Sequence, residues 1–170
     1  MIDINKYQAI ALTRNLEYLK KQMIADSTSP QVINEIRFPG NVSLLEAALS
    51  ARKFDIANYL LDMNAPVNVV TDEQNNELSI VTPWINDSEA LMIAERLVKR
   101  DVDLTLADKK FGNPVLLSIV IECVQHMNER KLQFMKACLD KEPNIFDLKN
   151  KRGVTIRMIL AQRKLDYLMA

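Results

Sequence analysis

The sequence predicts an all-α protein built as a stack of short helix pairs. Apolar residues recur at spacings of three and four, as in Leu12, Leu16 and Leu19, and this spacing places them on one face of a helix. The alternation of apolar and polar residues that is typical of half-buried strands is nearly absent. Glycine occurs only three times, and polar stretches separate the short amphipathic segments. Helices of this length are marginal in isolation, so they must bury their apolar faces against neighbouring helices.

The composition is that of an ordinary globular domain without a dominant charge. Of the 170 residues, 48% are apolar, and 22 lysines and arginines balance 22 aspartates and glutamates. A net charge of zero supplies no overall field for binding nucleic acid or an anionic membrane. The N-terminal residues lack the pattern of a secretory signal, and no apolar run approaches the roughly 18 residues of a membrane span. With only two cysteines, the chain is expected to be a single cytoplasmic domain over residues 1–170 that binds neither nucleic acid nor membrane and needs no cofactor.

Several segments of the chain resemble one another at a regular interval. Residues 56–68 align with residues 93–105, which lie 37 positions later, and a more divergent third copy runs through residues 134–146. The glycines repeat as well, because the residues after Gly40 resemble those after Gly112. Periods of this length are typical of repeat arrays. The sequence predicts units over residues 1–36, 37–73, 74–108, 109–149 and 150–170.

Each unit is expected to contain an antiparallel pair of helices. The more regular apolar stripes predict the second helices, at residues 15–24, 54–63, 88–99, 129–140 and 163–169. Ala47 and Ala48 are expected in a first helix, where small side chains let two helices approach closely. Two interpretations of Thr82-Pro83 remain open. The dipeptide opens the first helix of its unit, since proline suits a first turn, or Pro83 lies near the end of that helix.

The best-preserved segment is 55–68, which reads Asp-Ile-Ala-Asn-Tyr-Leu-Leu-Asp-Met-Asn-Ala-Pro-Val-Asn. It is similar to the second helix and following loop of the ankyrin repeat, which has the form Glu-Ile-Val-x-Leu-Leu-Leu followed by Gly-Ala-Asp-Val-Asn. The sequence resembles the ankyrin-repeat family over nearly its whole length, although its units of about 37 and 41 residues exceed the usual ~33. The Gly-His of the turn between the helices is also replaced, for example by Arg52-Lys53. The resemblance implies a solenoid of about five helix pairs with projecting turns between the units.

Residues that suggest catalysis or metal binding are few. Cys123 and His126 lie three positions apart on a helical face, and Cys138 lies in the next helix, so a metal site is conceivable there. It would need a fourth ligand, which the spacing does not supply. No nucleophile motif, phosphate-binding glycine-rich loop or metalloprotease motif is present. We therefore expect no catalytic residues, no cofactor and no metal site.

Basic and aromatic residues gather near the predicted turns. Lys109-Lys110 and Lys151-Arg152 each precede a repeated glycine, so they are expected at the tips of neighbouring turns, on one edge of the stack. Such an edge suits an acidic patch on a protein partner, and aromatic residues beside it are typical binding anchors. The predicted partner-binding residues are Arg37, Phe38, Trp84, Lys109, Lys110, Phe111, Lys151 and Arg152.

The sequence leaves three candidate functions open. The resemblance implies a non-catalytic module that binds a partner protein through the turn tips and the concave face, for example as an inhibitor or an immunity protein. The second is a metal-binding regulator or enzyme that uses Cys123, His126 and Cys138. The third is a structural subunit of a permanent assembly, since the apolar C-terminal residues are a poor cap for a stack. The oligomeric state expected for the first function is a monomer or a weak homo-oligomer.

Overall fold

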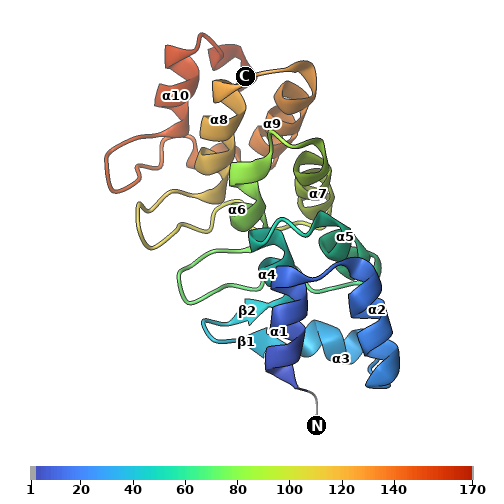
Figure 1. The fold of residues 1–170 in the computed structure, drawn as a ribbon. Helices are drawn as coiled ribbons and strands as arrows, with labels where there is room; N and C mark the ends of the chain where they lie inside the picture. The colour runs from blue at the N-terminus through green and yellow to red at the C-terminus, as the bar shows by residue number, and fades with distance from the viewer. Residues whose placement is uncertain (1–2, 170) are drawn as a thin grey trace.

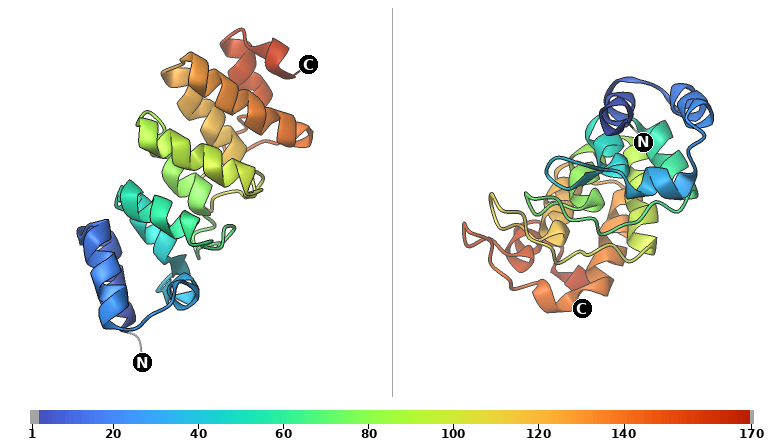
Figure 2. Two further views of the ribbon diagram at one scale, coloured as in Figure 1. Left: turned by 90° about the vertical axis from the view of Figure 1, so that its right-hand side faces the viewer. Right: turned by 90° about the horizontal axis from the view of Figure 1, so that it is seen from below.

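The computed structural model describes residues 3–169, and the chain is mainly helical, as predicted. The described residues do not include Met1, Ile2 and Ala170. The expectations for the N-terminal segment and the C-terminal cap therefore fall partly outside them. The helices form successive pairs that stack from the N-terminal to the C-terminal end of an elongated molecule (Figure 1, Figure 2). None of the helices in the described part is long and apolar enough to cross a bilayer.

One layer of the stack contains the first helix of each pair. In chain order these helices are α1 (Ile4–Thr13), α4 (Leu44–Ser50), α6 (Glu77–Val81), α8 (Val115–Gln125) and α10 (Ile156–Gln162). Each packs against the next one in this series, so the layer is continuous from α1 to α10.

The second helices form the other layer, and these are the helices that the sequence predicted best. They are α2 (Leu16–Ala25), α5 (Phe54–Asp62), α7 (Ser88–Lys99) and α9 (Glu129–Lys141), followed by the 3-10 helix η3 (Asp166–Met169). The bounds of the four α-helices differ from the predicted ones by at most one residue. The prediction of a helix at 163–169 was wrong, because only the 3-10 turn forms there and Tyr167 is 62% exposed.

The structure decides between the two interpretations of Thr82-Pro83. Helix α6 begins earlier, after Asn76, whose side chain accepts a hydrogen bond from the amide of Ser79 while the Ser79 hydroxyl accepts one from the amide of Asn76. This reciprocal cap fixes the helix start. Thr82-Pro83 follows the last turn and forms the 3-10 helix η1 (Thr82–Trp84), so the interpretation in which the dipeptide opens the helix is wrong.

Two features of the first half of the chain were not predicted. Helix α3 (Pro30–Glu35) lies near the end of the first predicted unit, where no helix was expected; Ser29 caps it and Pro30 occupies its first turn. The strands β1 (Arg37–Phe38) and β2 (Val42–Ser43) form a two-residue antiparallel pairing, and they are the only named strands in residues 3–169. This small hairpin agrees with the expectation of little sheet.

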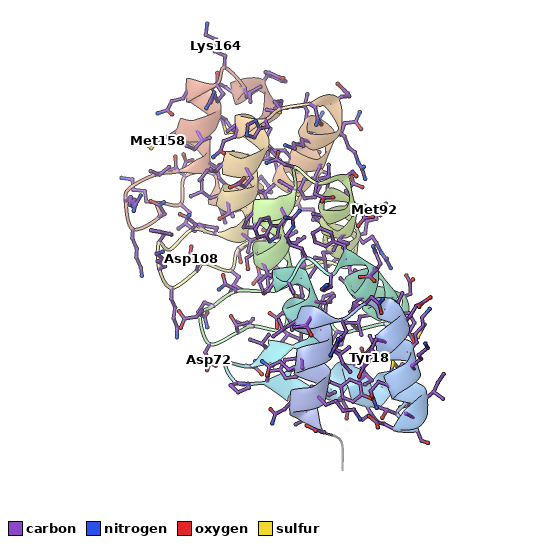
Figure 3. The ribbon with its side chains drawn as sticks, in the orientation of Figure 1. Tyr18, Asp72, Met92, Asp108, Met158 and Lys164 are labelled. Atoms are coloured by element: carbon purple, nitrogen blue, oxygen red, sulfur yellow. The ribbon has the colours of Figure 1, made fainter. Side chains whose placement is uncertain are left out.

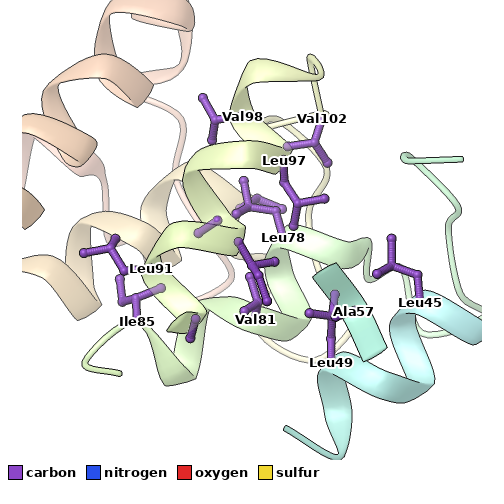
Figure 4. Close-up of a cluster of buried hydrophobic side chains, with 14 of the residues drawn as sticks. Leu45, Leu49, Ala57, Leu78, Val81, Ile85, Leu91, Leu97, Val98 and Val102 are labelled. Atoms are coloured by element: carbon purple, nitrogen blue, oxygen red, sulfur yellow. The ribbon is translucent and has the colours of Figure 1, made fainter. Parts of the chain in front are cut away.

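The core runs between the two helix layers along the whole stack. In the part drawn in Figure 4, side chains of α4, α5, α6 and α7 interlock, and Leu78 and Leu97 at its centre are fully buried. Ala47 and Ala48 are buried as expected, and Leu60 is only 1% exposed. Because each pair buries its apolar face mainly against its neighbours, the stability of one pair depends on the next.

Candidate interaction surface

Four loops project from one side of the stack, each leading into a first helix (Figure 1). They span residues 37–43, 69–76, 105–114 and 147–155, and we call them the first to fourth projecting loops. In Figure 3, Asp72 and Asp108 mark this edge, and Tyr18 and Met92 of the second helices lie at the opposite edge.

Backbone hydrogen bonds join the projecting loops to one another. The amide of Asp72 donates to the carbonyl of Gly40 at 2.8 Å, and the amide of Lys109 donates to the carbonyl of Glu73 at 3.3 Å. The amide of Lys151 donates to the carbonyl of Phe111 at 2.9 Å. The four loops therefore form one continuous edge and not four independent flexible segments.

Phe111 lies between two cationic side chains on this edge. The Lys110 ammonium and the Arg152 guanidinium carbon are each 4.8 Å from the centre of its ring, within the range of a cation–π interaction. Gly112 makes this arrangement possible, because its φ of +65° lies in the left-handed region and a Cβ there would be 3.1 Å from Cγ of Lys151. The sequence placed these residues at neighbouring turns, and the structure brings them together.

The remaining two lysines of the predicted set lie at the same place. Lys109 and Lys151 are exposed, and the Lys151 ammonium donates to the carbonyl of Lys109. The third and fourth projecting loops thus present four cationic side chains around one half-buried aromatic ring.

Phe38 and Arg37 do not belong to this surface. Phe38 is 3% exposed and packs in the core, because the hairpin folds back against the first helices and turns this side chain inward. Its assignment to the partner-binding set was wrong. Arg37 is half-buried, and its Nη1 donates to the carbonyls of Asn34 and Ile36 at 2.8 Å each, so it holds the loop after α3 in place.

Trp84 lies apart from the projecting loops. It follows the C-terminal end of α6, whereas the second projecting loop precedes the N-terminal end of the same helix. The Arg52 guanidinium carbon is 4.9 Å from its ring centre and the same guanidinium is 3.5 Å from the carboxylate of Asp87. This aromatic–arginine pair lies in the turns that follow the C-terminal ends of the first helices, whereas the projecting loops precede their N-terminal ends.

The loop edge carries negative charge that the sequence analysis did not assign to it. Asp72 and Glu73 at the second projecting loop are exposed, and they lie between the first loop and the basic third loop. Neither residue belongs to the predicted partner-binding set, although both occupy a turn that precedes a first helix. The edge is therefore acidic at its second loop and basic at its third and fourth.

Charges on the two edges of the molecule differ in whether they have partners. On the second helices, Arg96 pairs with Asp62 at 2.6 Å and Arg130 with Glu95 at 2.8 Å. Within residues 3–169, by contrast, no ion pair includes any of the charged loop residues Asp72, Glu73, Lys109, Lys110, Lys151 and Arg152. These six charges are therefore free to meet those of another molecule, whereas Asp147 at the start of the fourth loop pairs with Arg157 at 2.7 Å.

Hollows open on both sides of Phe111. The hollow between the second and third loops has a volume of about 360 Å³, and the carboxylates of Glu73 and Asp108 and the ammonium of Lys110 line it. The hollow between the third and fourth loops has a volume of about 320 Å³ and a mainly apolar lining that includes Ile121, Val154 and Ile159.

The cysteines and the histidine do not form a common site. Cys123 and Cys138 are fully buried, and burial raises the pKa of both thiols, so both carry their protons at neutral pH. His126 is exposed at the end of α8, where its backbone carbonyl accepts a hydrogen bond from the buried Lys131 ammonium at 2.9 Å. In the described part of the chain, no three His, Cys, Asp or Glu side chains are grouped so that they could hold a metal ion.

A buried pair of glutamates lies where the first helices of two units meet. Glu46 and Glu77, at the starts of α4 and α6, are both fully buried. The amide of Ser43 donates to Oε2 of Glu46 at 2.7 Å, whereas Oε1 of Glu46 has no hydrogen-bond partner. Burial, with the charge of Glu77 adding to it, raises the pKa of Glu46 to about 7, and burial also raises the pKa of Glu77. The pair was not predicted, because Glu46 occupies an ordinary capping position and Glu77 lies in a first turn, where acidic residues are common and usually exposed.

Comparison with known proteins finds similarity in fold but not in sequence. No protein-family model matches the sequence, and no curated protein matches it. The fold is similar to a chain in the solved structure of the Bd0816 predatory endopeptidase from Bdellovibrio bacteriovorus in complex with immunity protein Bd3460. The TM-score is 0.69, with 96% of this chain and 79% of that chain covered, and the sequence identity is 15%. At this identity the similarity concerns the fold.

Proposed function

We propose that this chain is a divergent ankyrin-type repeat protein that binds and inhibits another protein through its projecting loops. The observation that carries the proposal is the edge of the third and fourth loops, where cations without ion-pair partners surround the half-buried Phe111. Aromatic and arginine side chains in such a setting are typical anchors of protein interfaces. The division into five repeat units and a cytoplasmic location belong to the same proposal.

The solved complex named above suggests the kind of inhibition. That complex joins an endopeptidase to an immunity protein, so a hydrolytic enzyme of the same cell is the partner we propose for this chain. An immunity protein needs no catalytic residues of its own, because it acts by occupying the surface of the enzyme. The arrangement of loops described above supplies a rigid, charged surface of the kind that such binding needs.

The proposal can be tested with the purified protein as bait in a native lysate of its source cells. We expect a captured hydrolase whose activity falls when the wild-type protein is added. The Phe111→Ala variant should inhibit less, and Lys99→Ala, on the outer face, serves as the matched control. A captured enzyme that keeps full activity in the complex would contradict inhibition. Equal capture by both variants would contradict the loop edge as the binding surface.

A structural role in a permanent assembly is the second candidate, because apolar side chains are exposed at the C-terminal end. Leu148 and Met158 are each 48% exposed, and Tyr167, further along the chain, is 62% exposed. A second copy that covered this end would produce a dimer in analytical ultracentrifugation, and Met158→Asp should dissociate it. A monomer at all concentrations would remove this candidate.

A further inference from the structure

We infer that the hollow between the third and fourth projecting loops receives an apolar side chain of the partner that lies next to a carboxylate. The inference rests on the proposed function and specifies the chemistry of the partner segment. Its basis is an apolar floor with the cation of Arg152 in its lining and a second cation, Lys110, on the shared Phe111 ring.

The floor of this hollow has the character of a binding site for an aliphatic or aromatic side chain. Ile121 of α8 and Ile159 of α10 line it together with Val154 of the fourth loop, and the Phe111 ring forms a further wall. The volume of about 320 Å³ exceeds that of a single leucine side chain, so one such group enters without displacing the lining.

The hollow is preformed, because hydrogen bonds hold its two sides together. Asn150 Nδ2 donates to Asn113 Oδ1 at 2.7 Å, and the amide of Lys151 donates to the carbonyl of Phe111 at 2.9 Å. Within each loop, Asp108 accepts from the amide of Phe111 and Asn150 accepts from the amide of Val154. A site that is already ordered loses little conformational entropy on binding.

Charge defines what accompanies the apolar side chain. Arg152 lines the hollow and Lys110 stacks on the same phenylalanine ring, and neither forms an ion pair within residues 3–169. An aspartate or glutamate next to the inserted side chain therefore meets the Arg152 guanidinium, and the Lys110 ammonium on the same ring adds to the attraction. On the other side of Phe111, Glu73 and Asp108 line the neighbouring hollow together with Lys110, so a carboxylate that entered there would meet two like charges. The acidic segment is directed toward the third and fourth loops.

The test uses capped synthetic peptides with one leucine followed by two aspartates in a glycine-serine background, titrated into the ¹⁵N-labelled protein. We expect the largest amide shifts at Asn113, Asn150 and Val154. The double variant Lys110→Glu/Arg152→Glu should weaken binding by about tenfold, which equals about 1.4 kcal/mol. A peptide in which lysines replace the aspartates should regain binding to this variant. Replacing the leucine by glycine should also weaken binding, and Lys99→Glu on the outer face should leave it unchanged.

Shifts confined to the second helices would overturn the inference, as would equal binding of the acidic peptide to the wild-type protein and to the double variant. The inference would also be overturned if no amide shifts appeared at the highest soluble concentration of the peptide. These results are distinct from a failure of the proposed function. If the capture of a hydrolase depended on Phe111 but the peptides did not bind in the hollow, the proposed function would stand and only this inference would be wrong.

Discussion

The guanidinium of Arg152 stacks at 4.8 Å on the ring of Phe111, although the two residues belong to different projecting loops. The contact joins the third and fourth projecting loops, and Lys110 approaches the same ring at the same distance. One aromatic side chain therefore positions two cations for contact with another molecule.

Removing the ring should separate binding from stability. Phe111→Ala eliminates both cation–π contacts and one wall of the apolar hollow, so partner binding should weaken by more than about 1 kcal/mol, the usual threshold for a hot spot. Because Phe111 is only half-buried, the free energy of unfolding should fall by no more than about 1 kcal/mol. Isothermal titration calorimetry and urea denaturation measure the two effects. A large loss of stability with unchanged affinity would assign the ring to folding alone.

Truncation of a core leucine should lower the stability of the protein far more than truncation of a surface lysine. Leu60 is 1% exposed between the helix layers, so Leu60→Ala should cost about 2–5 kcal/mol of unfolding free energy. Lys110 is exposed, and Lys110→Ala should change stability by about 0.5 kcal/mol or less. Equal shifts of the urea midpoint in the two variants would contradict the burial described above.

The two glycines of the basic loops provide a matched pair of substitutions. Gly112 and Gly153 both have positive φ, so alanine at either position introduces backbone strain of about 1 kcal/mol. At Gly112 the added Cβ also meets Lys151, whereas at Gly153 nothing lies within 4 Å. Gly112→Ala should therefore weaken partner binding and lower the melting temperature more than Gly153→Ala does. Identical effects would show that the approach of Lys151 to Gly112 has no consequence.

The buried glutamate pair predicts that stability falls as the pH rises through neutrality. The pKa of Glu46 is about 7 in the folded protein, and its ordinary value, which applies to the unfolded chain, is 4.5. At a pH between these two values the folded state therefore binds more protons than the unfolded state. The stability that Glu46 contributes is fully present below its unfolded pKa and is lost as the pH rises through its folded pKa. The raised pKa of Glu77 acts in the same direction. The neighbouring cation that opposes both shifts is Arg37.

Glu46→Gln is the corresponding test, because it removes the charge and keeps an acceptor for the amide of Ser43. The wild-type protein should lose roughly 2–3 kcal/mol of unfolding free energy between about pH 5 and about pH 8, and the variant should lose much less. Urea titrations at the two pH values measure this difference. A wild-type protein that becomes more stable over this range would contradict the assignment.

The fold was predictable from sequence where the apolar pattern is regular. The second helices follow from stripes such as that containing Ile56 and Leu60, and their bounds were accurate for this reason. The first helices are shorter, and the start of α6 depends on a cap between Asn76 and Ser79 that no apolar pattern reveals. Phe38 was misplaced because a glycine-bounded turn resembles a surface loop, whereas tertiary packing against the first helices turns its ring inward.

The candidate surface was only partly predictable. The basic residues before the two glycines indicated equivalent turn tips, which is a property of any repeat. The joint contact of Lys110 and Arg152 with one ring depends on the register between two loops, and backbone bonds such as that from Lys151 to Phe111 set this register. The acidic second loop was not assigned to the surface because isolated carboxylates in polar turns are usually just solvated.

The central claim is that the partner binds the projecting loops and not the outer face of the second helices. Surface plasmon resonance with the captured partner compares Lys109→Ala/Lys110→Ala with Lys99→Ala/Lys136→Ala, which replaces two exposed lysines of α7 and α9, so both variants lose two positive charges. The loop variant should associate more slowly and with a flatter salt dependence, because it lacks two cations that attract an acidic partner. The outer variant should bind as the wild-type protein does. Loss of binding in the outer variant alone would contradict the account.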